Sequence, residues 1–128
     1  MSYWTHIVAS IDAETYIESD TIKTDVEKML ERAPKITGSE GPADVFVNVL
    51  SGYNVSCWDE DKHHEYQTRV VITVVGDLRD RMKEQTEKEW TEFKKFIGEE
   101  LLEDSDEEGN PDGLNFGIRN CSYEIIGW

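Results

Sequence analysis

The side chains that suit a soft metal ion such as zinc are few in this chain. They are His6, His63, His64, Cys57 and Cys121. Cys57 and the two adjacent histidines lie on either side of a polar turn, so a folded hairpin would bring them near one another. A zinc site needs about four ligands in a tetrahedral arrangement, and the spacing here matches no zinc finger or ribbon. We therefore expect no metal site and no cofactor.

A second group with possible chemistry is a run of carboxylates in the last third of the chain. It contains Glu99, Glu100, Glu103, Asp104, Asp106, Glu107, Glu108 and Asp112, with no basic residue among them. Counted from Asp104, Gly109 falls at the glycine position of a calcium-binding EF-hand loop. Asn115, however, occupies the last position, where a glutamate is needed. The run predicts no dedicated calcium site and is better suited to attracting a basic partner.

Motifs for covalent or phosphate chemistry are absent from the sequence. The chain has no Gly-x-Ser-x-Gly nucleophile elbow, no glycine-rich phosphate loop and no cysteine–histidine pattern of a catalytic pair. Paired carboxylates for acid–base catalysis cannot be distinguished in a chain so rich in acids. We therefore expect a protein that is not an enzyme.

Charge is the most unusual property of the composition. The 128 residues include 28 acidic and 13 basic side chains, which gives a formal net charge of −15. Such a surface repels nucleic-acid phosphates and anionic lipid and attracts basic surfaces. We expect a basic protein partner and no direct binding to nucleic acid or membrane. The same charge would also be consistent with a role in solubility alone.

The cysteine count and the N-terminal residues bear on the cellular compartment. Two isolated cysteines do not form a disulfide scaffold. The first ten residues lack the basic start and apolar run of a signal peptide. No segment approaches the ~20 apolar residues of a membrane-spanning helix. These features predict free thiols in a reducing cytoplasm.

The elements that would position these residues centre on the apolar stretch Thr68–Leu78. Its β-branched residues predict a central strand with most of both faces covered, which Gly76 and Asp77 then end. The extended run Ala43–Trp58 precedes it closely enough to form a long hairpin with it. Alternating apolar residues predict a first strand over Tyr3–Ala13. A last strand is expected over Leu114–Trp128.

Two helices are expected between these strands. The first has an apolar stripe that ends at Pro34, and its start is marked by a Thr24–Glu27 capping box or by a cap one turn earlier, at Asp20 or Thr21. The second covers Leu78–Leu102, where apolar residues recur at steps of three and four. The segment between the first helix and the second strand, Lys35–Pro42, reads as a loop.

The expected element order is strand, helix, strand, strand, helix, strand. This is the ferredoxin-like βαββαβ plan, a four-stranded antiparallel sheet with two helices on one face and its first and third strands central. We expect a single domain over residues 1–128, with a long central hairpin.

The helix-free face of such a sheet is a candidate interaction surface. If Ile7, Ala9 and Ile11 face the helices, then Trp4 and His6 face outward, and we expect Phe46 beside them. An apolar patch of this kind is large for a monomer surface. We expect it to bind a protein, most simply a second copy in a homodimer, unless the hairpin or the C-terminal residues cover it.

In size, acidity and lack of catalytic motifs, with the acidic run over Glu99–Asp112, the chain resembles the small acidic inhibitors that phages encode against host defence, anti-CRISPR proteins among them. That resemblance implies a viral protein in the host cytoplasm that mimics nucleic acid and masks a basic nucleic-acid-binding partner. Two alternatives remain open. One is an immunity protein that neutralises a toxin, and the other is a homo-oligomer that binds a small ligand.

Overall fold

The computed structural model describes residues 4–15, 20–54, 65–102 and 116–127. In chain order they form β1 (Trp4–Thr15), α1 (Ile22–Glu31), β2 (Thr37–Gly38), β3 (Gly41–Pro42), β4 (Asp44–Asn54), β5 (Glu65–Arg79), α2 (Lys83–Leu102) and β6 (Gly117–Gly127).

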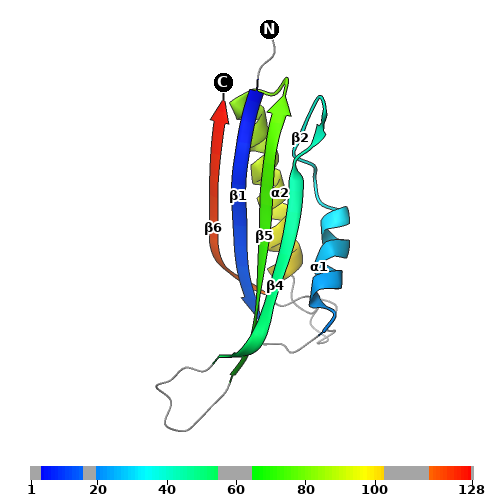
Figure 1. Cartoon of the computed structure of the whole chain (residues 1–128), viewed down its shortest axis with the longest axis vertical. Coiled ribbons are helices and arrows are strands. Elements are labelled where there is room, and N and C mark those ends of the chain that lie inside the picture. Colours follow the sequence, from blue (N-terminus) through cyan, green and yellow to red (C-terminus); the bar gives the residue numbers. More distant parts are fainter. Residues whose placement is uncertain (1–3, 16–19, 55–64, 103–115, 128) are drawn as a thin grey trace.

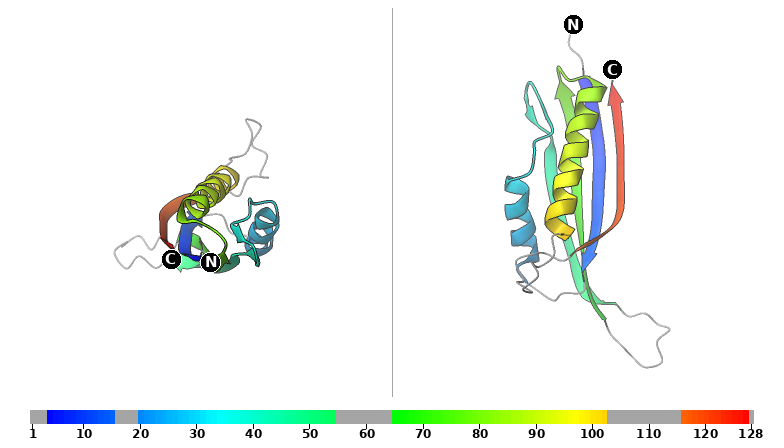
Figure 2. Two further views of the ribbon diagram at one scale, coloured as in Figure 1. Left: turned by 90° about the horizontal axis from the view of Figure 1, so that it is seen from above. Right: turned by 180° about the vertical axis from the view of Figure 1, so that it is seen from behind.

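The four long strands form one antiparallel sheet in the order β4-β5-β1-β6. Both helices lie on the same side of this sheet, with α2 against β1 and β6 and α1 beside β4 (Figure 1, Figure 2). The predicted α+β class, with a four-stranded antiparallel sheet and two helices, is therefore confirmed. We call the side without helices the open sheet face.

The connection before β4 differs from the prediction. Within Lys35–Pro42, expected to be a loop, β2 and β3 pair as a separate two-stranded sheet. The observed element order therefore departs from the six-element plan. Ser39 at the tip of this small hairpin donates its backbone N–H to the Arg79 carbonyl at 2.9 Å, which fixes the hairpin against the end of β5.

The core lies between the sheet and the helices. Alternate residues of β1 and β5 point to that side, so Ile7, Ile11 and Ile72 are completely buried. From α2, Trp90 and Phe93 cover them, with their ring centroids 5.9 Å apart. Core residues recur at every second position in the strands and at every third or fourth position in the helix. These spacings place them on one side of each element, and the sides together form a single buried layer.

Helix α1 begins at the earlier of the two predicted positions. Thr21 is its N-cap residue, and its hydroxyl donates to the Asp25 carboxylate at 3.0 Å instead of capping a backbone N–H. The Thr24–Glu27 capping box is therefore wrong, because both residues lie inside the helix with exposed side chains. Val26 lies on the buried side of α1, and this side of the helix packs against the sheet beside β4.

Strand β5 continues past the point where the sequence predicts its end. Gly76 and Asp77 both pair with β1, so the expectation that they stop the strand is wrong. The expectation of a helix from Leu78 is also wrong, because Leu78 is a buried strand residue and α2 begins only after a turn. The chain turns at Asp80, whose φ of 59° lies in the left-handed region.

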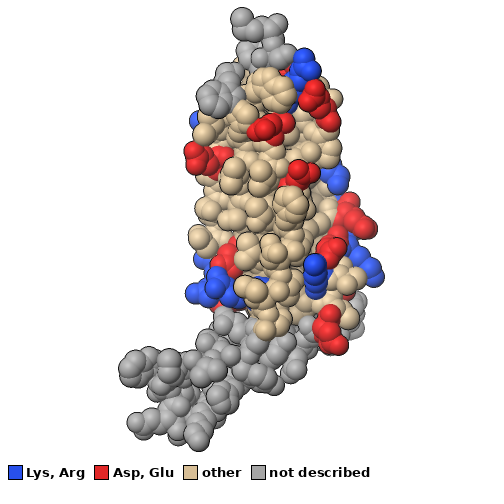
Figure 3. Space-filling view, in the orientation of Figure 1, with Lys and Arg blue, Asp and Glu red and all other residues tan. Residues whose placement is uncertain are grey.

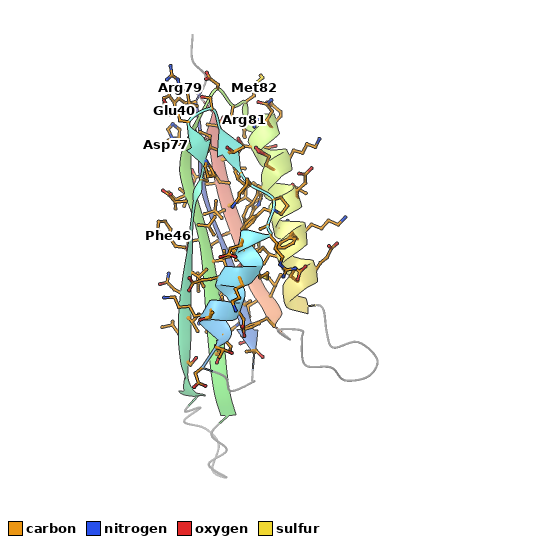
Figure 4. All side chains as sticks on the ribbon, turned by 90° about the vertical axis from the view of Figure 1, so that its right-hand side faces the viewer. Glu40, Phe46, Asp77, Arg79, Arg81 and Met82 are labelled. Atoms are coloured by element: carbon orange, nitrogen blue, oxygen red, sulfur yellow. The ribbon has the colours of Figure 1, made fainter. Side chains whose placement is uncertain are left out.

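A group of polar contacts holds this turn to the rest of the fold. The Arg81 guanidinium donates from Nε to the Thr37 carbonyl at 2.7 Å and lies 3.7 Å from the Glu89 carboxylate (Figure 4). Glu89 also accepts the Thr37 backbone N–H at 3.3 Å. The Thr5 hydroxyl donates to the Arg81 carbonyl at 2.7 Å. Residues of β1, β2 and α2 thus meet at one end of the sheet.

Gly76 is required for close packing. A Cβ added at this position would lie 2.8 Å from the Cβ of Ala43, just before β4. We expect Gly76→Ala to lower the free energy of unfolding by about 1–3 kcal/mol, the usual cost of overpacking. Gly117→Ala is the matched control, because a Cβ there meets no atom within 4 Å. Urea unfolding measures both variants, and equal midpoints would contradict this role for Gly76.

Candidate protein-interaction surface

The open sheet face is built from the side chains that alternate with the core positions. Directly paired residues of antiparallel strands share a face, so the strand register sets out the surface in rows. One row runs across the sheet through Phe46, Thr73, Ser10 and Ser122. The Ser10 and Ser122 hydroxyls lie 3.2 Å apart and share a hydrogen bond. The row is uncharged from one edge of the sheet to the other.

Large apolar side chains are concentrated on this face. Val8 is 58% exposed, Phe46 54%, Leu50 66%, Val75 39% and Ile126 42%. They come from all four long strands. Figure 3 looks onto this face and shows a broad uncharged surface with separate acidic groups on it. Exposed apolar residues scattered singly need no explanation, but a contiguous group on one face is typical of an interaction site.

Carboxylates lie at both ends of a neighbouring row of the open sheet face. The register places Asp44, Val75, Val8 and Glu124 side by side, with one acid on each edge strand and the two valines between them. Within the described part of the chain, neither Asp44 nor Glu124 forms a hydrogen bond or ion pair through its side chain. This row is therefore apolar at its centre and negatively charged at both ends.

Other charges on the open sheet face are paired. The His6 imidazole contacts the Asp77 carboxylate, and the Arg69 guanidinium contacts the Asp12 carboxylate. The hydrogen bond and the charge of Asp12 both raise the pKa of Arg69, so the guanidinium stays protonated. At the end of the sheet, Arg119 lies 3.3 Å from Glu14. The charges of the two arginine pairs cancel, and every acid in these three contacts has a partner, whereas Asp44 and Glu124 have none within the described residues.

Three residues that the sequence predicts for an interaction surface lie on this face. Trp4 and His6 lie at one end of β1, and Phe46 lies on β4, where its side chain points away from the helices (Figure 4). Trp4 is only partly exposed, since it lies beside Arg79 of the neighbouring strand. The sequence predicts that most of both faces of the central strand are covered, but on the open sheet face Val75 and Asp77 are exposed.

The acidic run divides into two parts. Glu99 and Glu100 lie in the last turn of α2, on the helix side of the sheet. Glu100 is 3.2 Å from Arg32 of the segment after α1, and Glu99 is 4.0 Å from Lys95. Each of these two acids therefore has a basic side chain close to it. The other six predicted acids lie outside the described residues: Glu103, Asp104, Asp106, Glu107, Glu108 and Asp112.

A groove lies along the outer edge of β4, between this strand and α1. It has a volume of about 460 Å³ and is lined by Lys23, Glu27, Leu30, Glu31, Lys35, Val45, Phe46 and Val47. A second pocket of about 210 Å³ shares Leu30, Lys35 and Val45 with it and reaches Phe93 of α2. We call the two together the α1–β4 groove.

The candidate metal ligands do not gather within the described residues. No group of three or more His, Cys, Asp or Glu side chains there could hold a metal ion. His6 is on the open sheet face, and Cys121 is half-buried on the helix side of β6. Burial raises the pKa of the Cys121 thiol, against a smaller opposite effect of Lys94. Cys57, His63 and His64 lie outside the described residues.

No family model matches the chain, and no curated protein matches it in sequence. Among the described helices, none is both long enough and apolar enough to cross a membrane.

Proposed function

We propose that this chain is a non-enzymatic binding protein whose open sheet face docks onto a basic partner protein and masks it. The observation that carries the proposal is the row in which two exposed valines lie between the unpaired acids Asp44 and Glu124. An apolar centre inside a charged rim is the usual composition of a protein–protein interface. The signs of the rim charges favour lysine and arginine on the partner.

The net charge supports a protein partner over nucleic acid. At −15, the chain repels phosphates, whereas nucleic-acid binding depends on lysine and arginine releasing counterions. The same charge attracts surfaces that themselves bind nucleic acid. A nuclease or another nucleic-acid-binding protein is the partner class that fits best, as the resemblance to phage-encoded inhibitors implies.

The dimensions of the face support a stable complex. With strands ~4.8 Å apart and a rise of ~3.3 Å per residue, four strands paired over some ten residues cover roughly 630 Å² in projection. A standard interface buries about 800 Å² on each partner. A homodimer through this face stays a prediction, but charge opposes it, because each copy carries −15 and would bring its own acids to the contact.

The ferredoxin-like assignment is part of the same proposal. The central positions of β1 and β5, the first and third long strands, support it. In this plan the helices occupy one side of the sheet only, which leaves the other side for a partner.

The test is a capture experiment with matched variants. Val8→Thr with Val75→Thr replaces the two exposed valines of the row with an acid at each end by a polar residue that suits a strand, and it leaves the α1–β4 groove, which Phe46 also lines, unchanged. Met82→Thr is the control, because Met82 is 55% exposed but precedes α2 and is not on the open sheet face. Each immobilised protein is incubated with extract of the cells that produce it, and retained proteins are identified by mass spectrometry.

We expect wild type and Met82→Thr to retain the same basic protein and the double variant to lose it. Retention of that protein by all three, or retention of nucleic acid without protein, would contradict the proposed function.

A further inference from the structure

Strand β4 forms an edge of the sheet that lacks the usual protection. Among the described strands, β5 is its only neighbour. From Val45 to Asn54 it contains no charged residue and no proline, in a chain whose residues are 32% charged. Natural edge strands normally carry lysine, proline or other charges that prevent pairing with another chain. The opposite edge, β6, follows that rule with Arg119 and Glu124.

The hydrogen-bonding groups that β4 turns outward can be assigned. Just before the strand, Ala43 donates its backbone N–H outward to the Ile36 carbonyl at 2.7 Å. Residues two apart in a strand direct their N–H and C=O groups to the same edge. The groups of Val45, Val47 and Val49 therefore also point outward, and within the described residues the Ala43–Ile36 bond is the last backbone bond along this edge.

The α1–β4 groove lies along this same edge. Val45 and Val47 line it from the strand, and Leu30 lines it from α1. Its volume of about 460 Å³ is within the range of ~300–1,000 Å³ that is typical of ligand sites. A strand added to β4 would place every second side chain in this groove, and the adjoining pocket beside Phe93 could take one apolar side chain.

We propose that the outer edge of β4, from Val45 to Val49, accepts an extended peptide segment of a partner protein as a fifth strand. Main-chain hydrogen bonds to the valines would supply affinity, and alternate apolar side chains in the groove would supply specificity. Glu27 and Glu31 line the groove together with Lys23 and Lys35, and none of the four forms an ion pair within the described residues, so the lining carries no net charge. It is the net charge of −15 on the chain that favours a segment with lysine or arginine and no acid.

A single strand fits this edge better than a second copy of the chain does. Helix α1 lies beside β4 and extends past the edge of the sheet (Figure 1, Figure 2). Antiparallel pairing of two β4 strands about a two-fold axis keeps the helices of both copies on the same side. Their α1 helices would then compete for the space over the joined edges, whereas a peptide brings no helix. This inference is independent of docking through the open sheet face.

Amide hydrogen exchange of the isotope-labelled full chain tests the proposal. The probe is a blocked nonapeptide of alternating valine and threonine with an arginine at each end. We expect exchange at Val45, Val47 and Val49 to slow roughly tenfold or more when the peptide is present at millimolar concentration. Exchange at Phe46 and Asn48, whose amides face β5, should not change. The same peptide with N-methyl groups on alternate residues cannot form the bonds and should have no effect.

Two variants complete the test. Val45→Lys places a charge in the groove at a position that is 40% exposed, and we expect it to abolish the protection at Val47 and Val49. Val8→Lys, on the open sheet face, should retain that protection, so failure of this proposal is distinguishable from failure of the proposed function. Protection that is absent, that appears on β6 instead or that survives Val45→Lys would overturn the inference. So would sedimentation showing that the free wild type is a dimer which Val45→Lys dissociates.

Discussion

Trp90→Ala should lower the free energy of unfolding by about 3–5 kcal/mol, the usual range for removing a large aromatic side chain from a core. Trp90 is 1% exposed and packs against Phe93, and its ring centroid is 5.9 Å from that of Tyr123 on β6. It therefore connects α2 to both the core and an edge strand. Since small domains have a total stability of only about 5–15 kcal/mol, this single change should bring the chain close to unfolding. Urea unfolding followed by far-ultraviolet circular dichroism measures the loss.

Trp90→Phe is the informative companion variant. Within the described residues, the Trp90 indole N–H is buried without a hydrogen-bond partner. Phenylalanine keeps an aromatic ring and removes that unpaired donor, whose burial carries its own cost. We expect Trp90→Phe to lose less than half as much stability as Trp90→Ala. Equal losses would show that the volume of the indole, and not merely an aromatic ring, is what the core requires.

The division of β1 into two faces could be predicted from the sequence. Apolar and polar residues alternate there with a period of two, and this pattern reports directly which side chains are buried. Ile7, Ala9 and Ile11 face the helices as expected, while Val8 is exposed on the open sheet face. The pairing of β4 with β5 also follows from short-range information, since the two strands are close in the sequence.

The end of β5 could not be predicted in the same way. Gly76 resembles a strand breaker, but its role depends on the nearness of Ala43, which only the folded sheet creates. The strand then continues to Leu78, whose burial gives it a core position that the helical pattern of the following residues conceals. The β2–β3 hairpin was missed because each of its strands has two residues, too few to show any period.

The candidate site was predicted only in part for a related reason. Trp4, His6 and Phe46 can be assigned to the open sheet face from alternation within single strands. Asp44 and Glu124 become a pair only through the register of four strands, because they are far apart in the sequence. The composition instead predicted a binding site at the densest acidic run. There, Glu99 lies close to Lys95 and Glu100 lies close to Arg32.

The two groups of acids should differ in their effect on association with the partner. We expect Asp44→Asn with Glu124→Gln to slow association with the basic partner about tenfold at low salt, because charges at the rim of an interface mainly affect the rate of encounter. Glu99→Gln with Glu100→Gln removes the same number of charges and should slow it much less. Stopped-flow measurements of the association rate constant, with each double variant and the wild type, make the comparison.

Salt dependence distinguishes a true steering effect from local damage to the interface. The screening length falls from ~30 Å at 0.01 M salt to ~8 Å at 0.15 M, so the difference between wild type and the Asp44–Glu124 variant should shrink as salt is added. Asp44 and Glu124 have no partner of their own within the described residues, whereas Glu100 lies 3.2 Å from Arg32 and already has part of its field cancelled. If the Glu99–Glu100 variant proves the slower of the two, the partner is attracted by the end of α2 and the acidic run, and the open sheet face is not where the complex begins to form.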